Sequence, residues 1–406
     1  MELIFTLKDE FEKISDPRVL GRTKHNLVDI LILSAIAIIC HAETWTEIED
    51  FGASKIDWLR KFIDLPNGVP SHDTIARVFS LIDPEHFQKV FIDWINRVRK
   101  KVKSDTICID GKVLSGTVER KAGTGREKVS TVNVWSTSQG LVLGQMRSGS
   151  GYGEANAVKD LLDILDFKGM IVVGDAGIGT RNVINKLVEK KADYLFPIKG
   201  NSRRMHKAVT EAFDEVSSNN TEKFIIKGDG HGRSETRQGF IIRKKNFPDG
   251  LNIKSDGVED FFNVKAIGKV VYESAEKEKR PIECVKDPRN PHVILRKTRT
   301  NKIRIKREVR YFITSLELPI KELMDKLRLQ WSIENKLHWI LDVSLGEDGN
   351  KTRNKNAAVN MSLVRKIAFN LAKQDKSSNL SVKRKLKRAG WENRYLEQLL
   401  FKKSLQ

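Results

Sequence analysis

The spacing of hydrophobic positions predicts helices over the first part of the chain. Apolar side chains at positions 87, 90, 91, 94 and 95 fall at i, i+3, i+4, i+7 and i+8, which is the repeat of an amphipathic helix. Ser71 stands just before another such stretch and is a typical residue at a helix start. We therefore expect residues 1–103 to form a helical N-terminal domain.

The pattern then changes to alternating strands and helices. Strand-like apolar runs lie at 106–110, 129–136, 141–146, 170–175 and 193–198, and helical runs lie at 154–166, 180–191 and 202–215. This order predicts an α/β layer with a mixed sheet over residues 104–221. Short strand-like runs predict a β-rich insertion over 222–316, and helical spacing returns over 317–406.

The charge of the chain indicates an anionic partner. The sequence holds 73 lysines and arginines against 53 aspartates and glutamates, a formal net charge of +20. Nucleic acid is the commonest partner for such a charge, and a membrane surface is the alternative. The longest apolar run, 30–40, is too short to cross a bilayer and lies too far in for a signal peptide. We interpret it as a buried helix of a cytoplasmic protein.

The three cysteines, Cys40, Cys108 and Cys284, are isolated from one another. Their spacing fits neither a disulfide framework nor a zinc site, so we expect reduced thiols that pack in the interior.

Three acidic residues have settings that suit metal-bound catalytic carboxylates. Asp110 ends the apolar run 106–110 and is followed by a glycine, and Asp175 ends the run 170–175 with a glycine two residues on. Glu334 lies in a helical stretch among bulky apolar and aromatic residues. An aspartate before a glycine turn is more often a turn former, and a helical glutamate is usually solvated. Two strand-end aspartates in one predicted sheet, with a glutamate that needs a partner, could instead hold two Mg²⁺ ions.

Two basic features lie on either side of Glu334 in the sequence. Lys302, Arg304 and Lys306 alternate with isoleucines, which predicts one cationic face on a half-buried strand. The segment 351–406 holds fifteen lysines and arginines against three acids. A charge run is usually only a solvated face, but the position of these two favours contact with DNA.

Many ordered motifs together resemble one family, the bacterial insertion-sequence transposases with an Asp-Asp-Glu core, in particular the branch of H-repeat-associated proteins. The similar segments are Asp16-Pro17-Arg18, Pro70-Ser71-His72-Asp73-Thr74, Ile109-Asp110-Gly111-Lys112, Gly140-Leu141-Val142-Leu143-Gly144-Gln145, Lys199-Gly200-Asn201, His231-Gly232-Arg233 with Glu235-Thr236-Arg237, and Trp331 through Trp339 with Asp342-Val343. The chain departs from the usual residues of the family at Thr180, at 151–153 and at Gln330.

The resemblance implies a fold and an activity. Similar proteins have a ribonuclease-H-like core, which residues 104–221 would begin and 317–406 would complete. They cleave and join double-stranded DNA at element ends and target, with two Mg²⁺ ions, for which Mn²⁺ could substitute. The three acids of the family fall on Asp110, Asp175 and Glu334. Lys112 and Lys199 are candidate phosphate contacts or plain solvated lysines. A homodimer on DNA is compatible with this interpretation.

Two other functions stay open on the sequence. A nuclease of the same fold would cleave DNA without joining ends, and a protein derived from a transposase could bind DNA without catalysis. The three intact acids favour an enzyme over the second of these. Inverted repeats around the coding sequence would distinguish an active element from both.

Overall fold

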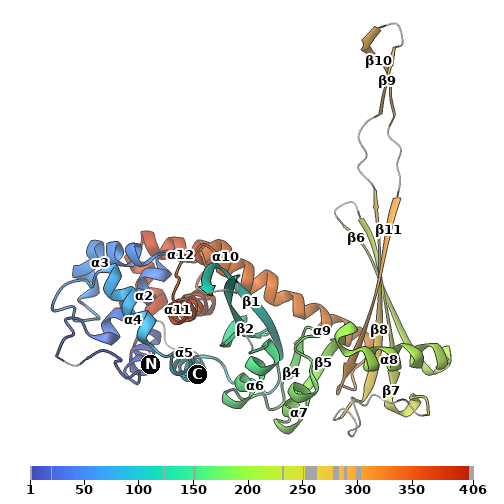
Figure 1. The fold of residues 1–406 in the computed structure, drawn as a ribbon, viewed down its shortest axis with the longest axis horizontal. Coiled ribbons are helices and arrows are strands. Elements are labelled where there is room, and N and C mark those ends of the chain that lie inside the picture. Colours follow the sequence, from blue (N-terminus) through green and yellow to red (C-terminus); the bar gives the residue numbers. More distant parts are fainter. Residues whose placement is uncertain are drawn as a thin grey trace. The chain divides into compact units, whose positions relative to one another are not determined.

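The chain folds into two compact units. The computed structural model describes residues 2–19, 21–121, 125–149, 152–230, 233–249, 251, 263–277, 283–287, 290–298 and 303–401. The first unit contains residues 1–194 and 326–406, and the second contains 195–325. Figure 1 labels the helices and strands. Both ends of the chain therefore belong to the first unit, and the second is an insertion within it.

The N-terminal part of the first unit is helical, as predicted. Its helices are α1 (Leu3–Phe11), α2 (Leu27–Ile39), α3 (Trp45–Leu59), α4 (His72–Leu81) and α5 (Pro84–Val98). The side chain of Ser71 accepts a hydrogen bond from the backbone N–H of Thr74 and caps α4. Helix α2 is buried over nearly its whole length, so its apolar residues do not form a stripe. The interpretation of the run 30–40 as a buried helix is confirmed.

A mixed sheet follows these helices. Its elements are β1 (Thr106–Lys121), β2 (Gly125–Ser136), β3 (Leu141–Ser148), α6 (Glu154–Ile164), β4 (Ile171–Gly174) and α7 (Arg181–Glu189). The strand order is β3-β2-β1-β4. Strand β1 is antiparallel to β2 and parallel to β4. The predicted mixed α/β layer is confirmed.

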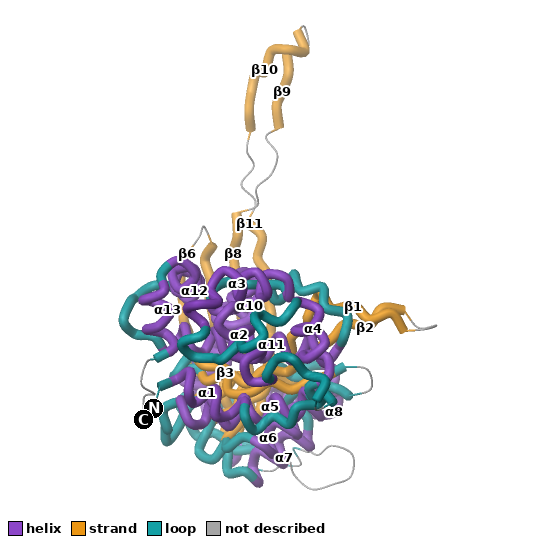
Figure 2. Tube along the Cα trace, turned by 90° about the vertical axis from the view of Figure 1, so that its left-hand side faces the viewer, coloured by secondary structure: helices purple, strands orange, loops and turns teal. Residues whose placement is uncertain are grey.

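The C-terminal segment completes the first unit. It contains α9 (Ile320–Ile333, within the unit from Lys326 on), a π-helical turn (Glu334–His338), α10 (Trp339–Leu345), α11 (Lys355–Gln374), α12 (Val382–Trp391) and α13 (Asn393–Leu400). Helix α11 is buried on all sides between α2, α4 and α5 and strands β1 to β3 (Figure 2). The Asn360 amide donates to the carbonyl oxygens of Phe79 and Ile82, both at 2.9 Å. This helix therefore joins the N-terminal helices to the sheet.

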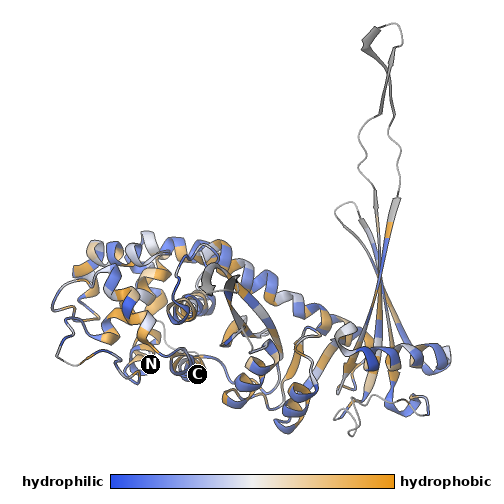
Figure 3. Cartoon of the chain, viewed as in Figure 1, coloured by the Kyte–Doolittle hydropathy of each residue, from blue (hydrophilic) through white to orange (hydrophobic). Residues whose placement is uncertain are grey.

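The second unit is β-rich and extends on both sides beyond the range 222–316 in which a β-rich insertion was expected. Its main elements are β5 (Asp193–Ile198, within the unit from Leu195 on), α8 (Arg203–Glu215), β6 (Glu222–Gly230), β7 (Arg233–Arg243), β8 (Ala266–Lys277) and β11 (Ile303–Thr314). The strand order is β5-β11-β8-β7-β6, and each described pair is antiparallel. Strands β9 (Glu283–Asp287) and β10 (Asn290–Thr298) pair with each other. Helix α8 is largely hydrophilic (Figure 3) and buries Met205, Val209 and Ala212.

Cys40 and Cys108 are free thiols. Burial raises the pKa of each to about 12, so both are packing residues and neither is a reactive thiolate. The side chain of Cys284 lies outside the described part. Across the described ranges, none of the helices has the length and apolar character needed to span a bilayer.

Candidate active site

Two of the predicted acids lie at neighbouring strand positions. Strands β1 and β4 are parallel, with Ile109 opposite Gly174. Asp110 follows Ile109 in β1, and Asp175 follows Gly174 directly after the end of β4. The two aspartates therefore lie side by side where β4 ends. Parallel strands carry their ligand sites at this carboxyl edge. The register of the sheet therefore brings together two residues that are far apart in the sequence.

Gly111 has a different role from the one predicted. We expected Asp110 to stand at the end of a strand, before this glycine, but β1 continues to Lys121, paired with β2. That part of the prediction is wrong, because the apolar run ended before the backbone pairing did. A Cβ at position 111 would overlap the carboxylate of Glu154 on α6. The glycine therefore makes room for a further acid beside Asp110.

The helix that carries Glu334 presents a row of four polar residues to these strands. Gln330, Glu334, His338 and Asp342 follow one another at intervals of four. In a regular α-helix such a row drifts by about 40° at each step. Here a π-helical turn spans Glu334–His338, with the N–H of Trp339 bonded to the carbonyl of Glu334. The wider turn offsets the drift, and π turns are frequent at functional sites.

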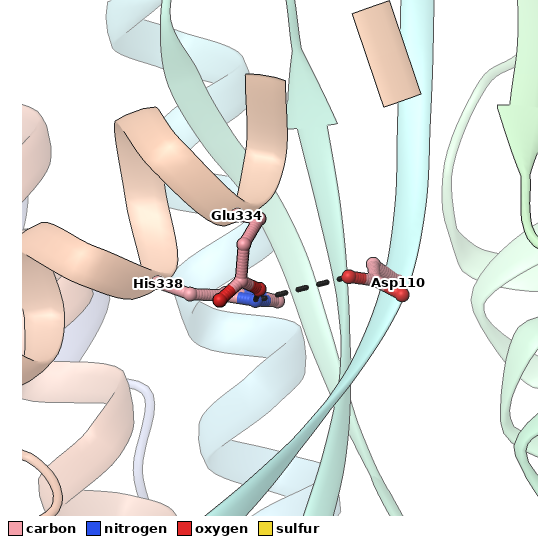
Figure 4. A group of neighbouring side chains, drawn as sticks. All are labelled: Asp110, Glu334 and His338. Carbon is pink, nitrogen blue, oxygen red and sulfur yellow. Dashed lines mark hydrogen bonds and ion pairs between the residues drawn. The ribbon is translucent and has the colours of Figure 1, made fainter. Parts of the chain in front are cut away.

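Asp110, Glu334 and His338 form a compact group (Figure 4). His338 Nδ1 lies 3.0 Å from Glu334 Oε2 and 3.8 Å from Asp110 Oδ2. Each residue offers one ligand atom, and these atoms all lie within 4.8 Å of one another. The sequence analysis missed His338. The spacing Glu-x-x-x-His on a helix was the signal that could have identified it.

Asp175 lies beside this group but does not belong to it. Its Oδ1 accepts a hydrogen bond from the N–H of Ile178 at 3.0 Å, which holds it in the turn after β4. With its amide oriented to satisfy both partners, Gln330 donates to the Gly174 carbonyl at 3.2 Å and accepts from the Asp175 N–H at 3.0 Å. The helix thus contacts the end of β4 as well as β1.

The acids of the site repel one another. Burial and then the nearby charge of Asp175 raise the pKa of Asp110 to about 7. The same two causes raise the pKa of Glu154. Burial lowers the pKa of His338, which favours a neutral imidazole. Crowded carboxylates and a neutral imidazole fit a divalent cation, because the cation relieves the repulsion and both ligand types bind it.

Lys112 fits neither of the two roles considered for it, a phosphate contact or a plain solvated lysine. Its side chain is buried, and Nζ lies 2.6 Å from Asp342, 3.6 Å from Asp348 and 3.9 Å from Glu347. Lys112 lies two residues after Asp110 on β1, so its side chain points to the same side of the strand. That side faces the helical segment that carries Glu334 and Asp342. Its ammonium group is therefore already neutralised inside the protein.

Part of the basic C-terminal segment is also buried. Lys366 Nζ lies 3.5 Å from Glu347, and both side chains are almost fully enclosed. Ser362 bonds to each of them at 2.6 Å. Burial lowers the pKa of Lys366 to about 8. Lys385 is likewise buried against Asp375. These two lysines are unavailable to DNA, so only other cations of the segment 351–406 could provide the expected contact.

The other predicted DNA contacts belong to the second unit. Lys199 is exposed just before a short 3₁₀ turn. Lys302 and the side chain of Arg304 lie outside the described part, and Lys306 on β11 is exposed. Glu308, two residues on, shares this face and pairs with Arg310. The bond from Arg310 and the charges of Arg310, Lys306 and Lys199 lower the pKa of Glu308. The face therefore includes an acid among its cations.

Comparison with known sequences identifies the family. The sequence pattern of the transposase DDE domain family matches residues 101–371, and that of the DDE_Tnp_1-associated family matches residues 8–95. The chain therefore belongs to the transposase DDE domain family. Its mixed sheet and flanking helices form the ribonuclease-H-like core, as the sequence predicted.

Relatives match over almost the whole chain. The protein named "Putative transposase YncI" from Escherichia coli O157:H7 is 34% identical over 98% of this chain and 95% of its own length. The "H repeat-associated putative transposase YhhI" of Escherichia coli (strain K12) is 34% identical over 97% of each chain. A shorter K12 relative named "Inactive transposase YbfQ" is 48% identical over 18% of this chain and 92% of its own length. A solved piggyBac transposase in a synaptic complex with hairpin DNA aligns over 98% of this chain and 78% of that one, at 10% identity and a TM-score of 0.37.

Proposed function

We propose that this protein is an active transposase that cleaves DNA at the ends of its element and joins them to a target. The observation that carries the proposal is the convergence of Asp110 and Glu334 beside Asp175, from three separate parts of the sequence. The excess of cationic residues supports DNA as the substrate. The family supports a nuclease or transposase class of enzyme.

The site residues would hold two divalent cations, Mg²⁺ or Mn²⁺. Asp110 would bind both, with Asp175 on one side and Glu334 on the other, and His338 would add a nitrogen ligand beside Glu334. Such ions lower the pKa of an attacking water or 3′-hydroxyl and stabilise the leaving oxygen of a phosphodiester. Oxygen ligands at this density are typical of Mg²⁺ sites.

The chain itself provides placement. The side chain of Glu334 is 68% exposed, so the site is open to a large substrate such as duplex DNA. Asp110 is half-buried and fixed by the pairing of β1 with β2 and β4. Holding the reacting groups in line supplies much of the rate enhancement, and no covalent enzyme intermediate is needed.

The test uses the full chain and duplexes that carry the candidate element ends. We expect cleavage and strand transfer with Mg²⁺ and neither with EDTA. Asp110→Asn, Asp175→Asn and Glu334→Gln should each remove most cleavage and keep DNA binding. Glu189→Gln, an exposed acid on α7, is the matched control and should cut at the unmodified rate.

The outcomes separate the three functions. Cleavage without joining would mean a nuclease of the same fold. Binding without cleavage under all metal conditions would mean a non-catalytic DNA-binding protein. A variant of one of the three acids that cuts at the unmodified rate would remove that residue from the site.

A further inference from the structure

A second site lies among the N-terminal helices. A cavity of about 540 Å³ opens between the segment 17–25 and helix α4. Its described lining consists of Pro17, Arg18, Val19, Arg22, Thr23, Lys24, His25, Thr74, Arg77 and Leu81. These include four permanently charged cations and a histidine, and none is a carboxylate. The lining chemistry is therefore that of an anion site.

The composition of this part of the chain does not explain the cluster. Residues 1–98 hold eleven lysines and arginines against sixteen aspartates and glutamates, so the helical part is net acidic although the chain is net basic. If charged residues were distributed at random over this part of the surface, acidic and basic side chains would be mixed, with the acidic ones in excess. Arg18 is paired with Asp16, and the other three cations, Arg22, Lys24 and Arg77, form a local concentration of positive charge around one cavity.

The segment is held in place by its own polar contacts. Arg18 donates from Nε and Nη2 to the two carboxylate oxygens of Asp16, at 2.8 and 2.6 Å. The same Nη2 bonds to the carbonyl oxygen of His25 at 2.9 Å. The amide of Asn67 donates to the carbonyl of Lys24. A cavity wall fixed in this way loses less entropy when a ligand binds.

Three of the cations are available to a ligand. Arg22, Lys24 and Arg77 are exposed, and within the described residues their side chains make no ion pair. Burial, followed by the charges of Arg18 and Lys24, lowers the pKa of His25, in agreement with a positive potential in the cavity. Val19 and Leu81, which are 66% and 47% exposed, also line the cavity, Val19 from the segment 17–25 and Leu81 from α4.

We propose that this cavity binds a backbone phosphate of double-stranded DNA. The proposal rests on DNA being the substrate of the protein. The N-terminal helices would then bind the duplex at a position outside the cleavage site. Arginines suit this ligand because their planar guanidinium groups bond phosphate oxygens in pairs. The exposed apolar side chains of Val19 and Leu81 would cover the neighbouring deoxyribose. Contacts of this kind position the duplex and carry no sequence information.

The experiment measures binding in EDTA, so that it does not depend on the catalytic acids. Fluorescence anisotropy with a labelled duplex, repeated over a range of salt concentrations, gives the slope of log K against log[salt]. The triple variant R22A/K24A/R77A should bind more weakly and flatten that slope by about 0.9 for each lost contact, on all duplex sequences alike. The control K61A/K89A/K101A removes three exposed lysines outside the cavity and should change the slope less.

Other results would overturn the proposal. Equal slopes for the two triple variants, with the same melting temperature, would mean that the cavity is only a solvated face. Inorganic phosphate that displaces the duplex fully at constant ionic strength would mean a site for free phosphate. The proposed function fails independently, when the unmodified protein binds these duplexes but neither cleaves nor joins them under any metal condition.

Discussion

Lys112 donates a hydrogen bond to Asp342 over 2.6 Å, and this contact joins the strand of Asp110 to the helical segment of Glu334. Lys112 shares a face of β1 with Asp110, since alternate residues of a strand point the same way. Asp342 continues the row of Glu334 and His338 along the helix. The pair therefore links the strand and the helical segment that carry the candidate site.

Breaking this contact should cost both stability and cleavage. Lys112→Met leaves Asp342 and Asp348 without their cation, and we expect a loss of about 3 kcal/mol in the free energy of unfolding. The double variant Lys112→Met with Asp342→Leu should lose less than the sum of the single variants. Urea unfolding of the four proteins measures the coupling, and additive losses would show that the pair does not act as a unit.

Asp110 should contribute a loss of stability to the metal-free protein as pH rises from about 4 to 7. The folded pKa of Asp110, about 7, lies above its ordinary value of 3.8, so the folded state holds a proton that the unfolded state has released. The contribution of Asp110 to the free energy of unfolding is fully present at low pH and is lost by neutral pH. Asp110→Asn lacks this titration. At pH 8 its free energy of unfolding should exceed that of the unmodified protein by no more than about 4 kcal/mol.

Melting curves at pH 5 and pH 8, in EDTA and in Mn²⁺, measure this difference. The advantage of Asp110→Asn should shrink in Mn²⁺, because a bound cation stabilises the charged carboxylate. An advantage that is the same at both pH values in EDTA would contradict the raised pKa.

His338 should contribute to metal affinity. Its Nδ1 points to Glu334 and Asp110, and its Nε2 lies 3.4 Å from the amide nitrogen of the buried Asn133. His338→Gln should lower Mn²⁺ affinity about tenfold, as loss of a ligand or of the group that orients one does. Electron paramagnetic resonance of free Mn²⁺ measures this without turnover. His86→Gln on α5 is the control, and equal affinities in the two variants would exclude His338 from the site.

The cationic face of the insertion remains a prediction. Replacing Lys302, Arg304 and Lys306 by alanine should flatten the salt dependence of DNA binding by about 0.9 per lost contact and affect unrelated sequences equally. Replacing Lys227, Lys244 and Lys245, which are exposed in the same unit, gives a matched control. An unchanged slope in the first variant would mean that the face is merely solvated.

Local pattern determined most of the secondary structure. The strands at 129–136 and 193–198 lie within or at the bounds observed, because the spacing of apolar side chains records which face of an element is buried. The sequence made Asp110 and Asp175 candidates because each closes an apolar run. It made Glu334 a candidate because bulky apolar and aromatic residues surround it in the sequence, although Trp331, Glu334 and Trp339 are all exposed. Each of these signals is contained in one short stretch of the sequence.

Tertiary structure decided which charged side chains are exposed to solvent and which are buried in ion pairs inside the protein. Lys112 and Lys366 look like surface cations in the sequence, but each is buried against acids that lie more than ten positions away. His338 carries no apolar pattern and joins Asp110 only because the helix packs across β1. Sequence periodicity reports the burial of a segment. The partner of a buried polar group depends on which segments pack together, and that is fixed only when the whole chain folds.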